Sequence, residues 1–279
     1  MSPARAPFGS RVMAAVSRRG PLCVGIDPHP RLLTEWGLPA SADGLRRFAL
    51  TAVEAVAGEV AAIKPQSAFF ETYGAAGIAV LEEVIAAGRA RGALVIADVK
   101  RGDIGSTMTA YASAYLAEGA PLAADAVTLS PYLGFASLAP AFDESARWGR
   151  GVFVLARTST ADGDPIQQAG TGDGRTVAQS IVDAAAERNA GASPVGSVGV
   201  VIGATRGRHG LDLAKLNGTI LAPGLGAQGA IPADLPRVFG EALRFVLPTA
   251  SREVLRHGPD PVALRLAAAR LRDQLAANA

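Results

Sequence analysis

The sequence predicts an α/β fold of the (β/α)8 TIM-barrel class, arranged as one domain over residues 1–279. Eight short apolar runs of strand type are spaced along the chain, and they alternate with stretches of helical periodicity. Eight such units in a chain of this length are typical of a closed parallel barrel. The composition agrees, because 49% apolar residues with only 5% aromatics suit a parallel sheet covered by helices. A doubly wound open sheet is the structural alternative, but that fold more often has fewer strands.

Each expected strand is a short run rich in Val, Ile, Leu and Ala. We place the eight strands at residues 21–27, 61–66, 94–100, 126–132, 151–158, 195–205, 218–226 and 244–252. Helices are expected at residues 41–60, 69–92, 107–118, 137–146 and 259–279. A further short helix is expected to begin after Ser10, so that residues 1–20 form an N-terminal helical extension.

The connection after the fifth strand differs from the others. Residues 159–174 read STADGDPIQQAGTGDG, sixteen positions rich in Gly and Asp. Connections of this length are uncommon in compact domains and are often functional. Because this one follows the carboxyl end of a strand, we expect it to be a lid, with a tolerated insertion as the alternative.

Composition and charge exclude several classes of function. Lys and Arg total 27 against 25 Asp and Glu, a formal net charge of +2, which gives no basis for a nucleic-acid or polybasic membrane surface. No uncharged apolar run approaches the ~20 residues that a membrane helix needs. The single cysteine, Cys23, cannot form an intrachain disulfide, which fits a cytoplasmic setting, and we expect it to be buried. His29, His209 and His257 form no ligand pattern, so no metal centre is expected.

One stretch, residues 94–107, combines strand character with charge and reads LVIADVKRGDIGST. Alternation along a strand places Asp98 and Lys100 on the same face, at the end of a strand that should otherwise be buried. A turn then brings a second carboxylate, Asp103, close in sequence. Buried charges are costly unless they are paired, so this cluster is either a structural ion pair or part of a catalytic site.

Polar side chains also follow several of the other strands at the point where each strand ends. In a (β/α)8 barrel these strand ends share one rim, and that rim carries the active site. The residues concerned are Asp27, Lys64, Asp98, Lys100, Ser130, Arg157, Thr158, Ser251 and Arg252. One such residue alone would be ordinary loop polarity, but their accumulation at one rim favours an active centre.

The loop after the seventh strand, residues 224–229, reads GLGAQG, formally a G-x-G-x-x-G pattern. A dinucleotide site would use this pattern in the first βαβ unit, whereas here it occurs late in the chain. Loops after strands seven and eight of a barrel commonly bind phosphate through backbone N–H groups. Arg252 would add a bidentate contact, so we predict phosphate binding rather than NAD binding.

Six motifs resemble the orotidine 5′-phosphate decarboxylase family, specifically its longer-chain branch. They are GIDPHP, IKPQSAFFE, ADVKRGDIGST, LSPYLG, APGLGAQG and TASR, and they follow the order of the strands over nearly the whole chain. The D-x-K-x-x-D element at Asp98, Lys100 and Asp103 is shared with related sugar-phosphate decarboxylases. Lys64 in IKPQ is the discriminating residue, because the metal-using relatives place an acid there. The resemblance implies an enzyme with no metal and no cofactor.

The resemblance also implies roles for individual residues. Lys64, Asp98, Lys100 and Asp103 would form a charged tetrad in which Lys100 is the proton donor. The residues expected to bind substrate are Asp27, Ile104, Thr107, Ser130, Gly226, Gln228, Ser251 and Arg252. The segment from Asp103 to Thr107 would reach the site of a partner subunit, which implies a homodimer with shared active sites.

Within the substrate set, the resemblance assigns Asp27 to the ribose, Ser130 to the pyrimidine, and Gln228 with Arg252 to the phosphate. The spacing of the phosphate loop differs between branches of the family. Gln167 or Gln168 of the long connection is therefore an alternative to Gln228.

The implied function is decarboxylation of orotidine 5′-phosphate to uridine 5′-phosphate and CO2, the last step of de novo pyrimidine biosynthesis. One alternative is a magnesium-dependent sugar-phosphate decarboxylase or aldolase of the same barrel superfamily, against which Lys64 argues. Another is a non-catalytic barrel that binds a phosphometabolite. Binding alone would not require the clustered Asp98, Lys100 and Asp103.

Overall fold

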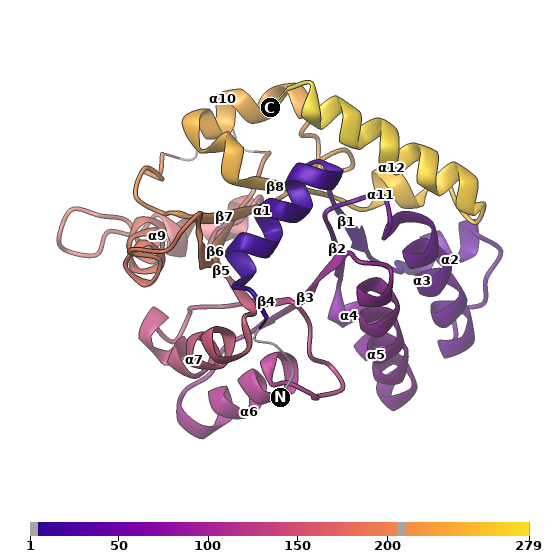
Figure 1. Ribbon diagram of the computed structural model, residues 1–279, viewed down its shortest axis with the longest axis horizontal. Coiled ribbons are helices and arrows are strands. Elements are labelled where there is room, and N and C mark those ends of the chain that lie inside the picture. The colour runs from indigo at the N-terminus through magenta and orange to yellow at the C-terminus, as the bar shows by residue number, and fades with distance from the viewer. Residues whose placement is uncertain (1–4, 206–209, 279) are drawn as a thin grey trace.

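A computed structural model describes residues 5–205 and 210–278. Its eight strands are parallel and close into a barrel in chain order (Figure 1). The strands are β1 (Cys23–Ile26), β2 (Ala62–Pro65), β3 (Leu94–Arg101), β4 (Ala126–Leu129), β5 (Gly151–Arg157), β6 (Gly196–Ile202), β7 (Gly218–Pro223) and β8 (Val246–Ala250). The barrel closes where β1 pairs with β8, with Cys23 opposite Thr249. The predicted fold class and all eight predicted strands are confirmed, although most strands end earlier than expected.

Helices surround the strands (Figure 1). The α-helices are α1 (Phe8–Arg19), α2 (Pro30–Glu35), α3 (Ala42–Val56), α4 (Ser67–Glu71), α5 (Gly74–Ala90), α6 (Gly105–Leu116), α7 (Ala139–Trp148), α8 (Asp164–Gln167), α9 (Val177–Arg188), α10 (Leu235–Phe239), α11 (Arg252–Leu255) and α12 (Pro261–Ala276). Short 3-10 helices are η1 (Phe135–Leu138), η2 (Ala161–Gly163), η3 (Pro232–Asp234) and η4 (Gly240–Phe245). Within the described ranges, none of these helices combines the length and apolar character needed to cross a bilayer.

Helix boundaries differ from the prediction by a few residues, and two of these differences have a clear cause in the backbone. The single helix expected at 69–92 is two helices, because Gly74 has a φ of +59°, a left-handed conformation that interrupts the helix and that glycine adopts without strain. The first helix begins at Phe8 rather than after Ser10. Pro7 precedes it in an extended conformation (φ −51°, ψ 145°), and the helix starts directly after this proline.

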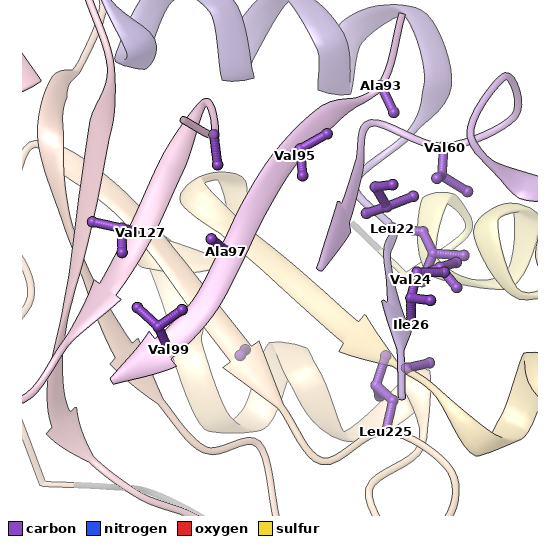
Figure 2. Close-up of a cluster of buried hydrophobic side chains, with 14 of the residues drawn as sticks. Leu22, Val24, Ile26, Val60, Ala93, Val95, Ala97, Val99, Val127 and Leu225 are labelled. Atoms are coloured by element: carbon purple, nitrogen blue, oxygen red, sulfur yellow. The ribbon is translucent and has the colours of Figure 1, made fainter. Parts of the chain in front are cut away.

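Strand alternation divides the barrel wall into two hydrophobic layers. Leu94 and Ile96 of β3 belong to the inner cluster that fills the barrel. Val95, Ala97 and Val99 belong to the outer cluster shared with the surrounding helices, and Figure 2 shows these three side chains in succession along β3. The same alternation brings the next residue on the inner face, the predicted aspartate, to the carboxyl end of the strand.

The N-terminal helix α1 is an integral part of the barrel. Phe8 and Val12 of α1 are buried in the inner cluster. The Phe8 ring meets the ring of Phe153 in β5 edge-on, with centroids 5.8 Å apart and planes at 90°. Gly9 permits this approach, because a Cβ there would lie 2.1 Å from the carbonyl oxygen of Val195, just before β6. The predicted extension therefore closes the amino-terminal end of the barrel.

A buried ion pair joins α1 to the strands at this end. Nη1 of Arg11 lies 2.5 Å from Oδ1 of Asp125, the residue before β4, and Nη2 donates to the carbonyl oxygen of Gly149 at 2.9 Å. The second carboxylate oxygen of Asp125 accepts the N–H of Val95 at 3.0 Å. Both oxygens of this buried carboxylate are thus hydrogen-bonded, as buried polar groups require. We refer to Arg11 and Asp125 as the floor pair.

The long connection after β5 is partly helical, since η2 and α8 lie within residues 159–174. Gln167 fastens it to the end of β5: its Oε1 accepts the N–H of Thr158 at 2.9 Å, and its Nε2 donates to Oγ1 of Thr158 at 3.0 Å. Arg157 forms an ion pair with Asp164 at 2.9 Å. The segment therefore starts as a short helical arm held at the strand end, and its role as a lid stays a prediction.

Candidate active site

A cavity opens at the carboxyl ends of the strands, the rim at which barrel active sites form. Residues predicted from the sequence line much of it, namely Asp27, Lys64, Asp98, Lys100, Thr158, Gln228, Ser251 and Arg252. They come from β2 and β3 and from the segments that follow β1, β5, β7 and β8. The fold thus gathers at one rim the polar residues that stand far apart in the chain.

Three of these residues form a continuous charged cluster, which we call the rim cluster. Nζ of Lys64 lies 2.5 Å from Oδ2 of Asp98, and Nζ of Lys100 lies 2.6 Å from Oδ1 of the same carboxylate. The side chains of Lys64 and Asp98 are each 7% exposed, whereas that of Lys100 is 44% exposed. Lys100 is therefore the member of the rim cluster that is open to a ligand in the cavity.

Burial and charge act against each other in the rim cluster. Burial alone lowers the pKa of a lysine and raises that of an aspartate. For Lys64, burial is outweighed by the carboxylates of Asp98 and Asp27, so the pKa of Lys64 is raised above its ordinary value. For Asp98, burial is outweighed by the ammonium groups of Lys64 and Lys100, which hold the pKa of Asp98 well below its usual range. The charged residues that line the cavity are Lys64, Lys100 and Arg252 against Asp27 and Asp98, so the lining has one net positive charge, which suits an anionic ligand.

Lys100 is presented to the cavity by an unusual stretch of backbone. Its φ of +47° lies in the left-handed region that non-glycine residues rarely adopt. The pairing of β3 with β4 shifts at this point: Ala97 pairs with Val127, and the next pair is Arg101 with Leu129. Such bulges occur near active sites, where they re-aim a side chain. The bulge explains how a lysine two positions from Asp98 can fold back onto its carboxylate.

Two predicted residues offer polar atoms for a ligand. Oδ1 of Asp27 and Oγ of Ser251 are buried and have no hydrogen-bond partner within residues 5–205 and 210–278. Both residues line the cavity. A buried polar atom without a partner is destabilising unless a ligand or water supplies the missing bond. Asp27 is therefore a candidate to accept a hydrogen bond from a hydroxyl group of a ligand, and Ser251 is a candidate to bind a hydroxyl group or an anion.

Gln228 and Arg252 line the cavity on the side of β7 and β8. Oε1 of Gln228 accepts a hydrogen bond from Oγ of Ser159 at 3.0 Å, which leaves the amide NH2 as a donor group. The two alternative glutamines are placed differently. Gln167 is bound to the end of β5, and Gln168 is exposed directly after α8. Of the three glutamines considered, Gln228 is the one that lines the cavity.

The segment predicted to serve a partner subunit lies outside the cavity of its own chain. Oδ1 of Asp103 accepts the N–H of Ile104 at 2.8 Å. Ile104 is 62% exposed, although it is a large apolar residue, and Thr107 is exposed on the first turns of α6. The fold brings Lys64, Asp98 and Lys100 together, whereas Asp103 does not join them within one chain.

Ser130 and Gly226 also lie outside the cavity. β4 ends at Leu129, so Ser130 is no longer directed by strand alternation, and its N–H donates to the carbonyl oxygen of Arg101 at 2.8 Å. Gly226 packs on α11, where a Cβ would lie 2.8 Å from side-chain atoms of Glu253. Their contact with a substrate stays a prediction.

Five polar cavity residues were missed by the sequence analysis: Gln66, Thr128, Ser159, Thr160 and Thr249. Gln66 follows Lys64 by two positions, and Thr128 precedes Ser130 by two, so strand alternation would have identified both. Ser159 had no comparable signal, because it begins the irregular connection and is placed by its long-range contact with Gln228.

Cys23 and His29 lie apart from this chemistry. Cys23 is buried in the inner cluster, and burial raises the pKa of its thiol to about 12, which confirms the expected buried cysteine. Nδ1 of His29 accepts the N–H of Arg31 at 3.3 Å and so caps α2. His209 lies outside the described residues. Among the described residues, no three His, Cys, Asp or Glu side chains are grouped so that they could hold a metal ion.

The fold and the cavity together define a (β/α)8 barrel whose carboxyl-terminal rim presents a lysine–aspartate–lysine cluster to a ligand. The chain belongs to the orotidine 5′-phosphate decarboxylase / HUMPS family, whose model matches residues 20–266. The family resemblance found in the motifs is thereby confirmed.

Individual relatives agree with this membership. The chain is 61% identical over 264 residues to the orotidine 5′-phosphate decarboxylase of Salinispora arenicola, covering 95% of each chain. Its identity to the enzyme of the same name from Streptomyces coelicolor is 58% over 264 residues, again 95% of each chain. A crystal structure from Streptomyces avermitilis, assigned to the same activity, matches with a TM-score of 0.97 at 55% identity, over 99% of this chain and 97% of that one.

Proposed function

We propose that this protein decarboxylates orotidine 5′-phosphate to uridine 5′-phosphate and CO2, the last step of de novo pyrimidine biosynthesis. The observation that carries the proposal is the position of Lys100, whose ammonium lies 2.6 Å from Asp98 and whose side chain is 44% exposed at the cavity. Family membership and relatives of that name at 55–61% identity support the same reaction.

The chemistry asks for a fixed cation that can also give up a proton. When the bond between C6 of the pyrimidine and its carboxylate breaks, CO2 leaves and the electron pair stays on C6. The Lys100 ammonium stabilises this developing charge and transfers a proton to C6, after which the neutral amine is reprotonated from water. A lysine is suited to both tasks because it is a compact cation with three donor hydrogens.

Asp98 keeps the two lysines in place and lies close to where the substrate carboxylate would sit. Two like charges ~4 Å apart at an effective dielectric of ~20 repel by about 4 kcal/mol. Both oxygens of Asp98 already accept a hydrogen bond from an ammonium group, however, so much of this repulsion is neutralised before the substrate binds. We therefore assign Asp98 chiefly to the orientation of Lys64 and Lys100.

Binding of the non-reacting parts of the substrate would be divided around the rim. Asp27 would accept a hydrogen bond from the ribose, and Gln228 with Arg252 would hold the phosphate through donor groups. Ser159 begins the 159–174 connection and donates to Gln228, so a bound phosphate would be linked to the predicted lid. Remote contacts of this kind can be used to stabilise the transition state when a lid closes over it.

The active enzyme is proposed to be a cytoplasmic homodimer with shared sites. Asp103, Ile104 and Thr107 lie outside their own cavity, and the exposed side chains of Ile104 and Thr107 are accessible to a second chain. In this arrangement Asp103 of one subunit would complete the charged tetrad of the other.

The test is the ultraviolet absorbance of orotidine 5′-phosphate incubated with the pure protein, recorded with and without EDTA. We expect a time-dependent absorbance change that yields uridine 5′-phosphate and survives chelation. An unchanged spectrum with demonstrable binding would favour the non-catalytic phosphometabolite barrel. Loss of turnover on chelation would favour the magnesium-dependent alternative. That alternative is disfavoured by the ammonium groups on both oxygens of Asp98, which a divalent cation would have to displace.

A further inference from the structure

The bulge in β3 creates a hydrogen-bonding problem beside the rim cluster. Between the pairs Ala97–Val127 and Arg101–Leu129, three residues of β3 stand opposite Thr128 alone. The extra residues of a bulge lose their place in the ladder. Buried backbone N–H groups nevertheless need acceptors, so another atom has to accept the hydrogen bonds that carbonyl groups of the partner strand accept in a regular ladder.

The hydroxyl of Thr128 meets this need. Its Oγ1 accepts the N–H of Val99 and the N–H of Lys100, each at 3.0 Å. It also donates to Oδ1 of Asp98 at 2.9 Å. A hydroxyl offers one donor hydrogen and two acceptor lone pairs, and all three are used here. Thr128 is itself only 1% exposed, so water does not compete for these bonds.

We propose that Thr128 is a positioning residue for the decarboxylation: its hydroxyl holds the Lys100 backbone and the Asp98 carboxylate in one fixed arrangement. This inference rests on the proposed function. Lys100 has a left-handed φ of +47°, a conformation that persists only where the surroundings impose it. The side-chain direction of Lys100 follows from that backbone, and its ammonium is bound to the same Asp98 oxygen that Thr128 binds.

The chemical identity of residue 128 therefore matters more than its size. Valine has nearly the shape of threonine and would fill the same space. It would leave the N–H groups of Val99 and Lys100 without their acceptor, and Oδ1 of Asp98 would lose one of its two donors. Serine would keep the hydroxyl and lose the methyl group, whose branching restricts the side chain to few rotamers. The pair Thr128→Val and Thr128→Ser thus separates the hydroxyl from the packing.

The experiment measures steady-state turnover of orotidine 5′-phosphate by the wild type, Thr128→Val and Thr128→Ser. We expect Thr128→Val to lower kcat by about 10- to 100-fold, as small displacements of reacting groups do, with KM changed less than about threefold. Thr128→Ser should recover most of the lost kcat. Thr219→Val is the matched control, because Thr219 is a buried threonine of β7 whose hydroxyl has no hydrogen-bond partner in the described chain.

A second readout does not depend on activity. Amide hydrogen exchange at Val99 and Lys100 should be faster in Thr128→Val than in the wild type and close to wild type in Thr128→Ser. A Thr128→Val enzyme with kcat within twofold of the wild type, or a Thr128→Ser enzyme as slow as Thr128→Val, would overturn the inference. If Thr128→Val does not fold, Thr128→Ala compared with Thr128→Ser makes the same distinction. A wild type without turnover would instead remove the proposed function, whatever the exchange rates.

Discussion

The barrel contains a buried carboxylate bound to a basic side chain at each of its two ends. At the rim, Asp98 is 7% exposed and lies 2.5 Å from Lys64. At the floor, Asp125 is 6% exposed and lies 2.5 Å from Arg11. The two carboxylates are nearly equal in burial and in distance to their basic partner, although Arg11 is 19% exposed and Lys64 only 7%. The floor pair and the rim pair of Asp98 with Lys64 differ in their surroundings, because the rim pair lines the cavity at the carboxyl ends of the strands.

Helix α1 covers the floor pair, and the remaining polar atoms of the pair are bonded to backbone groups of Ala6, Val95 and Gly149. The rim cluster has a third member, Lys100, which is 44% exposed and faces a cavity. A buried ion pair is therefore not by itself a sign of an active site. The sign is a charged group that is held by buried partners and still open to a ligand.

Removal of Lys100 should have the largest effect, and it should affect catalysis rather than stability. Lys100→Ala is expected to fold and to lose at least about 10⁴-fold in kcat, because one residue supplies both charge stabilisation and the proton. The melting temperature should change little, since this lysine is the half-exposed member of the rim cluster. Turnover of orotidine 5′-phosphate and thermal unfolding measure the two effects. Near-normal turnover would exclude Lys100 from the mechanism.

Mixing of two inactive variants tests whether Asp103 of one subunit contributes to the active site of the other. Lys100→Ala and Asp103→Ala homodimers should each be nearly inactive. After unfolding and refolding together, mixed dimers would contain one site with both residues intact, so activity should return to about a quarter of the wild-type level. Each variant refolded alone is the control. No recovery from the mixture would place Asp103 in the site of its own chain, and an active Asp103→Ala homodimer would place it outside the mechanism.

Disruption of the floor pair should affect stability rather than catalysis. Arg11→Met leaves Asp125 buried without its cation, and we expect the free energy of unfolding to fall by about 3 kcal/mol. The kcat of the folded enzyme should stay unchanged. Denaturant unfolding measures the first and turnover the second. Arg31→Met is the matched control, because Arg31 and Glu35 form an exposed pair, for which less than about 1 kcal/mol is expected.

The pH dependence of stability should show the smallest effect. The pKa of Asp98 is lowered in the folded protein, so its ion pairs stabilise the fold at pH values above its unfolded pKa of ~3.9. This contribution is lost as the pH falls below about 4, when the unfolded state takes up the proton. The difference in unfolding free energy between wild type and Asp98→Asn should be constant from about pH 5 to 8 and shrink by on the order of 2 kcal/mol in acid. A difference that stays constant down to pH 2–3 would contradict the lowered pKa.

Most of the rim was accessible to sequence analysis because it depends on local patterns. Apolar runs located the strands, and the ends of parallel strands had to meet at one rim. Alternation predicted Asp98 and Lys100 on one face, although the direction of Lys100 is set by the bulge in β3. Ser130 shows where this reasoning stops. Alternation holds only while the strand lasts, and β4 ends at Leu129, one residue too early.

Other features depend on contacts between distant segments. Ser159 and Gln228 are 69 positions apart, and no local pattern pairs them. The N-terminal helix was expected as an extension, but its amphipathic pattern did not indicate which surface it would cover. Packing of Phe8 into the barrel makes it the floor instead.

The barrel, the order of its strands and most of the charged residues at its rim could be predicted from the sequence, because strand and helix patterns act over a few neighbouring residues. Which buried charges are covered and which face a cavity could be seen only in the tertiary structure. It also decided that one hydroxyl, on Thr128, serves Asp98 and the Lys100 backbone at once. Both outcomes depend on how β3 is registered against β4 and on what covers each end of the barrel, and such register and coverage arise only when the whole chain is packed.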